Sequence, residues 1–394
     1  MVGTQKVDRD LMRNSNTRLV LSTIYKAREL SKAQIAAATK MSVVSVGRIA
    51  DELVMRGFVR EQVKLADGQA VGRPPKVLSL AADQLLCCGV FLEREALHLG
   101  LMDPYGVLEA EELHPFSLQE SFAPEEILPL VADKLAAFLR KQQLLHSILG
   151  TVGVVVPGIV DLAAGALQYA SNFTWSNVPI APFLHARLPD YDFVLENDIK
   201  AVATAEHRFG SAANCNNMVI LNVGNGIGAA VILNGQIYRG KNNMAGEIGH
   251  IIINPGGKIC ECGQAGCLQT NIARWAILAE ARCVYPGVTL PELFALCARG
   301  DSFAVALIEK VVDYTAIAIS LLANTYSPET ILLCGSTIRQ NPLFKTMLLE
   351  SYKSKLNDYI RDSFALRFES FSRNSHIIGG GAVAFNHELG AMVF

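Results

Sequence analysis

The segment GEIGHIIINPGGKICECGQAGCLQ, residues 246–269, places one histidine and three cysteines close together: His250, Cys260, Cys262 and Cys267. Their spacing is His-x9-Cys-x-Cys-x4-Cys. Three thiolates and one imidazole complete a tetrahedral zinc site, and full ligation without an open position is typical of a structural zinc. Four glycines between the histidine and the last cysteine let the backbone wrap around an ion. We therefore expect one structural zinc per chain, the alternative being free thiols in a flexible loop.

Apolar strands and amphipathic helices alternate on both sides of this segment. The run LGTVGVVV, residues 149–156, is apolar throughout, as in a strand that is buried on both faces. Further strands are expected at 85–92, 97–103, 192–196, 218–223, 227–233 and 331–334, and helices at 124–145, 199–209 and 303–326. This alternation predicts an α/β body over residues 83–394, with two lobes and a cleft between them.

The N-terminal end of the chain differs from the body in charge. Residues 1–80 carry 14 Lys and Arg against 7 Asp and Glu, whereas the remaining residues carry 21 against 30. A basic segment on an acidic body indicates a nucleic-acid-binding module joined to a second unit. The alternative is a chance fluctuation in charge.

Three short helices and a hairpin are expected in this basic segment. The helices are predicted at 17–28, 32–40 and 43–57, with caps at Asn16, Ser31 and Ser42, and the strands at 58–60 and 76–80. Leu19, Val20, Ile24 and Tyr25 would share one side of the first helix, and Val46, Ile49, Leu53 and Val54 would be buried by the third. This order predicts a winged helix-turn-helix over residues 1–82, the alternative being a three-helix protein-interaction domain.

The third helix is the candidate for recognition of DNA bases. Its exposed N-terminal half carries Ser42, Val43, Ser45 and Arg48, whose hydroxyl, methyl and guanidinium groups suit base edges and phosphates. The loop Gly-Arg-Pro-Pro-Lys is extended by its prolines. We expect it to place Arg73 in an A·T-rich minor groove, where narrowing concentrates the negative potential.

Composition limits the class of protein. Of the 394 residues, 51% are apolar and 18% charged, which excludes widespread disorder. No apolar run is long enough for a spanning helix and no secretory signal is recognised, so we expect a cytoplasmic protein without membrane insertion. The remaining six cysteines lie in apolar stretches and are expected to be small core residues: Cys87, Cys88, Cys215, Cys283, Cys297 and Cys334.

The Glu-Ile-Gly-His sequence at 247–250, followed by Cys-x-Cys-Gly-x-x-Gly-Cys-Leu at 260–268, resembles the ROK family (repressor, open reading frame, kinase). Leu-Glu-Asn-Asp at 195–198, Pro-Gly-Ile-Val-Asp at 157–161 and Trp-Ser-Asn-Val-Pro at 175–179 extend this likeness. The resemblance begins near residue 85 and implies a two-lobed, actin-like (ribonuclease-H-like) ATPase-type fold. With an N-terminal winged helix, it implies a sugar-responsive repressor of the NagC/Mlc type.

The resemblance also implies a sugar site in the cleft. Its residues would be Asn172, Asn197, Asp198, Glu247, His250 and Gln269. The residue matching Asp198 is the general base of the family's kinases, and an adjacent carboxylate and amide are suited to sugar hydroxyls. His250 would hold zinc through one ring nitrogen and donate to the sugar from the other. An alternative for Asn197 and Asp198 is a cap of the helix at 199–209.

The phosphate-binding elements of the family's kinases are altered in this chain. Residues 89–95, GVFLERE, lack the Asp-x-Gly-Gly-Thr-type loop, and two glutamates there would repel phosphate. Residues 224–230 keep the glycines of the second loop, but residues 334–337 read Cys-Gly-Ser-Thr instead of a glycine run. Gln269 stands where the family usually has Glu, which indicates an altered or weakened sugar site.

The leading hypothesis is a repressor of carbohydrate-metabolism genes that binds operator DNA as a homodimer or homotetramer and is switched by a sugar or sugar derivative. It would not be an enzyme, and Asp198 would be a vestigial base. Two rivals stay open. One is a sugar kinase with an appended DNA-binding module, and the other is a repressor controlled by a sugar-transport protein.

Overall fold

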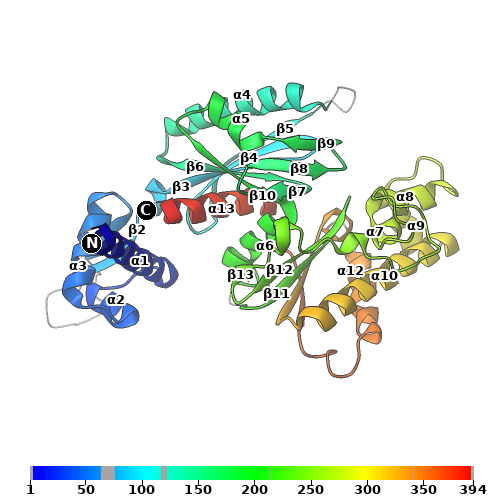
Figure 1. Ribbon diagram of the computed structural model, residues 1–394. Coiled ribbons are helices and arrows are strands. Elements are labelled where there is room, and N and C mark those ends of the chain that lie inside the picture. The colour runs from blue at the N-terminus through cyan, green and yellow to red at the C-terminus, as the bar shows by residue number, and fades with distance from the viewer. Residues whose placement is uncertain (1–2, 64–75, 117–121, 214, 340, 392–394) are drawn as a thin grey trace.

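The computed structural model describes residues 3–63, 76–116, 122–213, 215–339 and 341–391. Figure 1 shows an N-terminal module beside two larger lobes, with the C-terminal helix returning to the first lobe and ending close to the module. The predicted Arg73 contact falls outside these residues. Among the helices of the described part of the chain, none has the length and apolar content needed to cross a membrane.

The N-terminal module is a helix-turn-helix followed by a hairpin, as predicted. It consists of α1 (Gly3–Ala27), α2 (Lys32–Thr39), α3 (Val43–Met55), β1 (Val59–Val63) and β2 (Lys76–Leu80), and the two strands are antiparallel. Two of the predicted caps are confirmed. Ser31 forms a capping box with Gln34, and the Ser42 hydroxyl accepts a hydrogen bond from the Ser45 amide at 3.1 Å.

Three details of this module differ from the prediction. Asn16 is not a cap, because α1 begins at Gly3 and Asn16 lies inside it. Leu19 and Val54 are 43% and 38% exposed. Leu19 lies about 100° around α1 from the buried Val20, and Val54 lies about 40° around α3 from the buried Ala50, so both are at the edge of the buried face or beyond it. The apolar pattern of the sequence therefore predicts a wider buried face than these two helices have.

Both lobes contain a five-stranded sheet with the same strand order. In the first lobe the order is β10-β6-β3-β4-β5, and in the second it is β13-β12-β11-β14-β15. In each sheet a three-stranded antiparallel meander is extended by two parallel strands. The repeat gives the two-lobed, actin-like and ribonuclease-H-like architecture that the sequence predicted.

The predicted strands of the body lie close to their expected positions, whereas β5, β7, β8, β9, β13 and β15 were not predicted. Those of the first lobe are β3 (Leu86–Leu92), β4 (Ala96–Met102), β5 (Leu108–Pro115), β6 (Ile148–Val156) and β10 (Asp192–Asn197), with a small separate sheet of β7 (Ile159–Asp161), β8 (Ala166–Ala170) and β9 (Trp175–Val178). Those of the second lobe are β11 (Met218–Val223), β12 (Ile227–Leu233), β13 (Gln236–Ile237), β14 (Thr330–Cys334) and β15 (Ala365–Phe368).

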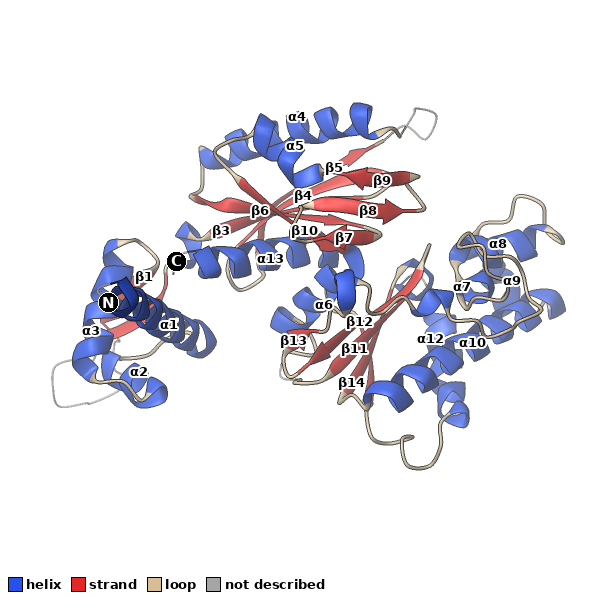
Figure 2. Ribbon diagram, in the orientation of Figure 1, coloured by secondary structure: helices blue, strands red, loops and turns tan. Residues whose placement is uncertain are grey.

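Helices cover the sheets of both lobes (Figure 2). In the first lobe, α4 (Pro124–Gln143) and α5 (Ile180–Arg187) lie on one face, and α13 (Ser375–Ala391) lies on the other. Helix α6 (Asp198–Phe209) lies between the lobes and contacts both α13 and β12. The second lobe carries α7 (Gln269–Ile272), α8 (Arg274–Arg282), α9 (Leu290–Ala298), α10 (Ser302–Tyr326), α11 (Ser336–Arg339) and α12 (Pro342–Ser351).

The N-terminal module shares its hydrophobic core with the body. Val20, Leu21 and Ile24 of α1 pack in one cluster with Ala384 and Phe385 of α13, and Cys87 of β3 belongs to the same cluster. The module is therefore held against the first lobe by buried apolar side chains as well as by the chain connection.

The scattered cysteines mostly meet the expectation. Cys87, Cys88, Cys297 and Cys334 are buried, and Cys215 is half-buried. The exception is Cys283, which is exposed because it follows the last residue of α8 at the surface.

Candidate metal centre and effector cleft

The predicted metal ligands come together in the second lobe. The Cys262 and Cys267 sulfurs lie 3.6 Å apart, and Cys260 Sγ lies 3.6 Å from His250 Nδ1. All four ligand atoms lie within 4.8 Å of one another. His250 ends a single 3-10 turn, residues 248–250, and the cysteine loop folds back on it through a bridge between Ile252 and Cys267.

The dimensions of this cluster fit a tetrahedral metal ion. A zinc–sulfur bond of about 2.3 Å implies about 3.8 Å between sulfurs at the corners of a tetrahedron, close to the 3.6 Å observed. Gly263 and Gly266 have φ of +87° and +80°, so the turn that wraps the site needs glycine. The backbone amide of Gln264 is the largest cause that lowers the pKa of Cys262 to about 7, which favours the thiolate. His250 Nδ1, Cys260, Cys262 and Cys267 would hold the ion, which would supply cross-linking rather than reaction chemistry.

Gln269 is directed at the metal centre, which the sequence did not predict. Its side chain is 97% buried, and its Nε2 donates to Cys260 Sγ at 3.1 Å and to a Glu261 carboxylate oxygen at 3.0 Å. The Ser171 hydroxyl, from the turn between β8 and β9, donates to the same Glu261 oxygen at 3.2 Å. Gln269 therefore joins the metal loop to the first lobe through Glu261. The neighbouring Asn172 is exposed, and its backbone oxygen accepts from Arg94.

Asn197 is the N-cap of α6, which was the alternative to a direct sugar contact. Its Oδ1 accepts from the amides of Ile199 and Lys200, each at 3.1 Å. Its Nδ2 donates to the Gly158 carbonyl at 3.0 Å and to Asp198 Oδ1 at 2.9 Å. All hydrogen-bonding directions of this carboxamide are thus used within the chain, and one of these bonds orients Asp198.

Asp198 begins α6 at the junction of the lobes. Its Oδ1 accepts from Asn197 and from the Ile199 amide at 2.9 Å. Burial raises the pKa of Asp198 to about 7, and the negative charge of Glu247 adds to this rise. Glu247 directly precedes the turn that carries His250. The structure thus places the charge of Glu247 near Asp198, whereas the Nδ1 of His250 faces the cysteines.

A buried polar network next to Asp198 was not predicted. Glu196 is 1% exposed and receives two hydrogen bonds from Arg239, at 2.6 and 3.0 Å. Lys200 is 2% exposed and donates to the Asn243 carbonyl at 2.9 Å. Burial lowers the pKa of Lys200. Arg239 and Asn243 lie in the loop after β13, so the network joins the second lobe to β10 and α6. The feature of the sequence that pointed to this network was a charged residue, Glu196, within an apolar strand.

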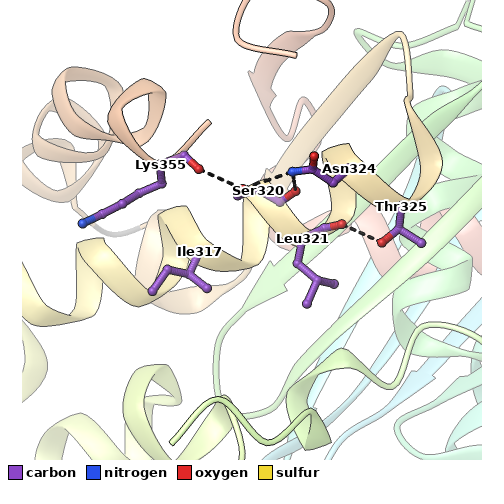
Figure 3. A pocket seen from close by; sticks show the side chains of 6 residues that line it. All are labelled: Ile317, Ser320, Leu321, Asn324, Thr325 and Lys355. Carbon is purple, nitrogen blue, oxygen red and sulfur yellow. Dashed lines mark hydrogen bonds between the residues drawn. The ribbon is translucent and has the colours of Figure 1, made fainter. Parts of the chain in front are cut away.

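A surface hollow of about 420 Å³ lies away from this site, along α10 (Figure 3). It is lined by Ile317, Ser320, Leu321, Asn324, Thr325 and Lys355. The Ser320 hydroxyl donates to the Lys355 carbonyl, Asn324 donates to Ser320, and Thr325 donates to the Leu321 carbonyl. These polar groups already have partners, and no titratable cluster lies among them. We therefore place the candidate site at Asp198 and the metal centre instead.

The predicted recognition residues of α3 lie at the surface of the N-terminal module. Val43 is 54% exposed, and Arg48 is also exposed. Ser45 is half-buried, and the Ser42 hydroxyl makes the cap described above and a 2.9 Å hydrogen bond to the Ser45 hydroxyl. Val44, which was not predicted, is 83% exposed on the same turn.

These features define a two-lobed, actin-like protein with an attached winged helix-turn-helix. Residues 107–387 match the profile of the ROK family. The chain belongs to the ROK family.

Two regulators are similar to most of the chain. The DNA-binding transcriptional dual regulator NagC of Escherichia coli K12 is 28% identical over 90% of this chain and 87% of its own length. The xylose repressor of Bacillus spizizenii is 25% identical over 97% of this chain and 98% of its own length.

Two solved structures share the fold. A ROK family transcriptional regulator described as a homologue of the E. coli MLC protein has a TM-score of 0.82 at 22% identity, over 97% of this chain and 99% of its own. A ROK hexokinase from Thermus thermophilus has a TM-score of 0.67 at 26% identity, over 77% of this chain and 99% of its own. The hexokinase thus matches a part of the chain that is close in size to the two lobes.

Removal of one metal ligand tests the metal centre. We expect Cys262→Ser to lose the bound metal and to lower the unfolding temperature, because the binding energy of a structural metal contributes to folding. Elemental analysis after dialysis against a weak chelator, followed by calorimetry, measures both effects. Cys283→Ser is the matched control, since Cys283 is exposed and outside the cluster. A wild-type protein that is folded and metal-free would contradict the assignment.

The raised pKa of Asp198 predicts a pH-dependent effect of Asp198→Asn on stability. The unfolded group ionises near its ordinary value of 3.8 and the folded group near 7. The folded state therefore binds the extra proton in this window, and wild-type stability falls as the pH rises through it. Asp198→Asn removes this loss, so we expect its unfolding temperature relative to wild type to be higher at pH 8 than at pH 4.5. Asp133→Asn, on an exposed residue of α4, is the control; equal differences at both pH values would refute the assignment.

Proposed function

We propose that the chain is a transcriptional repressor that binds operator DNA and responds to a sugar held between the two lobes. The main support for this proposal is that a winged helix-turn-helix and a ROK fold share one hydrophobic core. The similarity to NagC and to a xylose repressor over most of their lengths supports the same function. Genes of carbohydrate metabolism are the targets that this similarity favours.

The DNA-binding part of the proposal rests on α3. Ser42, Val43, Ser45 and Arg48 would face the major groove, with Ser42 also fixing the start of the helix. Arg73 would reach the minor groove from the loop between β1 and β2. A homodimer or homotetramer would present more than one such helix, as symmetric operators require.

The sugar-binding part of the proposal rests on Asp198. A carboxylate at the start of α6, oriented by Asn197, is suited to accept hydrogen bonds from adjacent sugar hydroxyls. Glu247 and the Nε2 of His250 would complete the site from the second lobe, with Asn172 at its edge. We assign Gln269 to support of the metal loop rather than to the sugar, because its amide group donates to Cys260 and Glu261. The metal is proposed to be zinc, one ion per chain.

The side chains at the end of β3 favour a repressor without kinase turnover over a kinase. Phe91 stacks on His376 at a centroid distance of 4.0 Å, and Glu93 accepts a hydrogen bond from His98 at 2.8 Å. An aromatic stack and a carboxylate there offer no donors to phosphate oxygens. The hexokinase neighbour and the retained Asp198 are the arguments for the rival. Control by a sugar-transport protein stays an alternative to control by a sugar. A cytoplasmic location without membrane insertion completes the proposal.

A sugar panel tests the effector response. N-acetylglucosamine, xylose, glucose and their phosphates are screened for an increase in unfolding temperature, and the active sugar is then added to a protein–DNA complex. We expect one sugar to raise the unfolding temperature and to release the DNA. Asp198→Asn should bind DNA with wild-type affinity but require at least tenfold more sugar. ATP turnover at ordinary enzyme rates that Asp198→Asn abolishes would favour the kinase instead.

A salt series tests the DNA-binding module. We expect Arg48→Ala to weaken binding to a duplex selected by the protein from a random library and to lower the salt slope by about 1, because each lost phosphate contact removes one released counterion. Fluorescence anisotropy at several salt concentrations measures both. Arg299→Ala, in the second lobe, is the matched control. Binding that Arg48→Ala leaves unchanged in affinity and slope would remove α3 from the interface.

A further inference from the structure

Helix α6 connects the candidate sugar site with the DNA-binding module. It begins at Asp198 at the junction of the lobes and ends at Phe209, with Arg208 in its last turn. Its 12 residues span about 18 Å at about 1.5 Å per residue. One continuous helix therefore carries a candidate sugar-binding carboxylate, Asp198, at one end and residues that contact the DNA-binding module at the other.

The middle of α6 has little freedom to move independently of its neighbours. Ala201, Ala203 and Ala205 are fully buried. A Cβ atom on Gly379 of α13 would lie 2.2 Å from the Ala201 carbonyl oxygen, so the two helix backbones are in direct contact. On the other side, a Cβ on Gly228 of β12 would lie 2.5 Å from Ile199. Because α6 is one continuous helix held by backbone contact at Ala201, a displacement of the Ile199 side chain by the second lobe would tilt α6 about this contact and move its last turn.

The last turn of α6 meets an aromatic cluster at the module. The guanidinium carbon of Arg208 lies 5.3 Å from the ring centre of Tyr25 in α1 and 5.8 Å from that of Phe385 in α13. Tyr25 stacks on Tyr105 of the first lobe at 5.6 Å with an interplanar angle of 7°. Arg28, which directly follows α1, lies over the ring of Tyr105, with its guanidinium carbon 3.4 Å from the ring centre.

Arg208 is held in this cluster mainly by ring faces. Its Nη1 is buried and has no hydrogen-bond partner among the residues that the structure describes. Arg208 as a whole is half-buried, so its charge is costly to place, and a cation above a ring has no directional bond that fixes it. The neighbouring Phe209 packs against the first lobe separately, because its ring lies 2.6 Å from the position that a Cβ on Gly106 would occupy.

We propose that Arg208 is a positioning residue through which α6 couples the occupancy of the sugar cleft to the orientation of the DNA-binding module. A sugar that binds Asp198 and the second lobe together would shift α6. The guanidinium of Arg208 would then move relative to Tyr25, and the DNA-binding module would change its orientation on the first lobe. This inference rests on the proposed function, which supplies the two ligands, a sugar and operator DNA. The mechanical link from Asp198 through α6 to α1 can be tested without either ligand.

Arg208→Met tests the proposal in the full-length chain. Methionine keeps an unbranched stem in the cluster and removes the charge. We expect sugar affinity, measured by calorimetry, to stay within about threefold of wild type. The selected duplex should bind in the absence of sugar, but the sugar should change its Kd by less than about twofold, against about tenfold in wild type, within the usual range of coupling.

Arg187→Met is the matched control. Arg187 also lies over a ring, 5.2 Å from the centre of Phe183, but on α5, which is not in the aromatic cluster. It should retain the wild-type response. A sugar response in Arg208→Met equal to that of wild type would overturn the role of Arg208 and leave the proposed function intact.

A second measurement needs no sugar. Hydrogen exchange of residues 17–28 is compared between wild type and Asp198→Asn, and again between the same pair carrying Arg208→Met. We expect Asp198→Asn to change the exchange of this segment only when Arg208 is present. If it does so while no sugar affects DNA binding, the inference stands and the proposed function fails. If exchange is unchanged in the presence of Arg208, the inference fails.

Discussion

The backbone contact between α13 and its neighbours is the constraint on which the rest of the structure depends. A Cβ on Gly89 of β3 would lie 2.0 Å from the Ile377 carbonyl oxygen, and one on Gly153 of β6 would lie 1.9 Å from that of Gly380. No side chain fits at these positions, so the helix has one depth and one register on the sheet. Because α13 also contacts α6 and carries Phe385, which packs with Val20, Leu21 and Ile24 of α1, the same helix positions both α6 and the DNA-binding module.

Features that depend on nearby residues were predictable from the sequence, and features that depend on distant ones were not. The caps at Ser31 and Ser42 and the His-Cys cluster arise within 18 residues or fewer, so spacing alone identified them. The partners of Gln269 and the bond between Glu196 and Arg239 were missed. In the first case family likeness indicated only a sugar contact and gave no sign of the bond to Cys260, and in the second the two residues are separated by 43 positions.

Two of the connections between the lobes differ in character. On the β10 side, the Glu196–Arg239 pair is a two-fold hydrogen-bonded ion pair with a fully buried carboxylate. Such a pair is costly to break, because separation leaves a buried charge without its partner. On the metal side, Ser171 of the first lobe donates a 3.2 Å hydrogen bond to the exposed Glu261 of the metal loop. This bond is weak, since both groups are accessible to water.

This asymmetry favours a hinge at β10 and opening at the metal loop. A rotation about the Glu196–Arg239 pair would break the bond between Ser171 and Glu261 first, while Gln269 would keep Glu261 attached to the metal loop. The metal would therefore act as a cross-link that makes the loop move as one body with the second lobe. Asp198 lies directly after the hinge strand, so the same rotation changes its distance to Glu247. A rotation of one lobe against the other about a fixed hinge is thus the kind of motion that the interactions between these lobes permit.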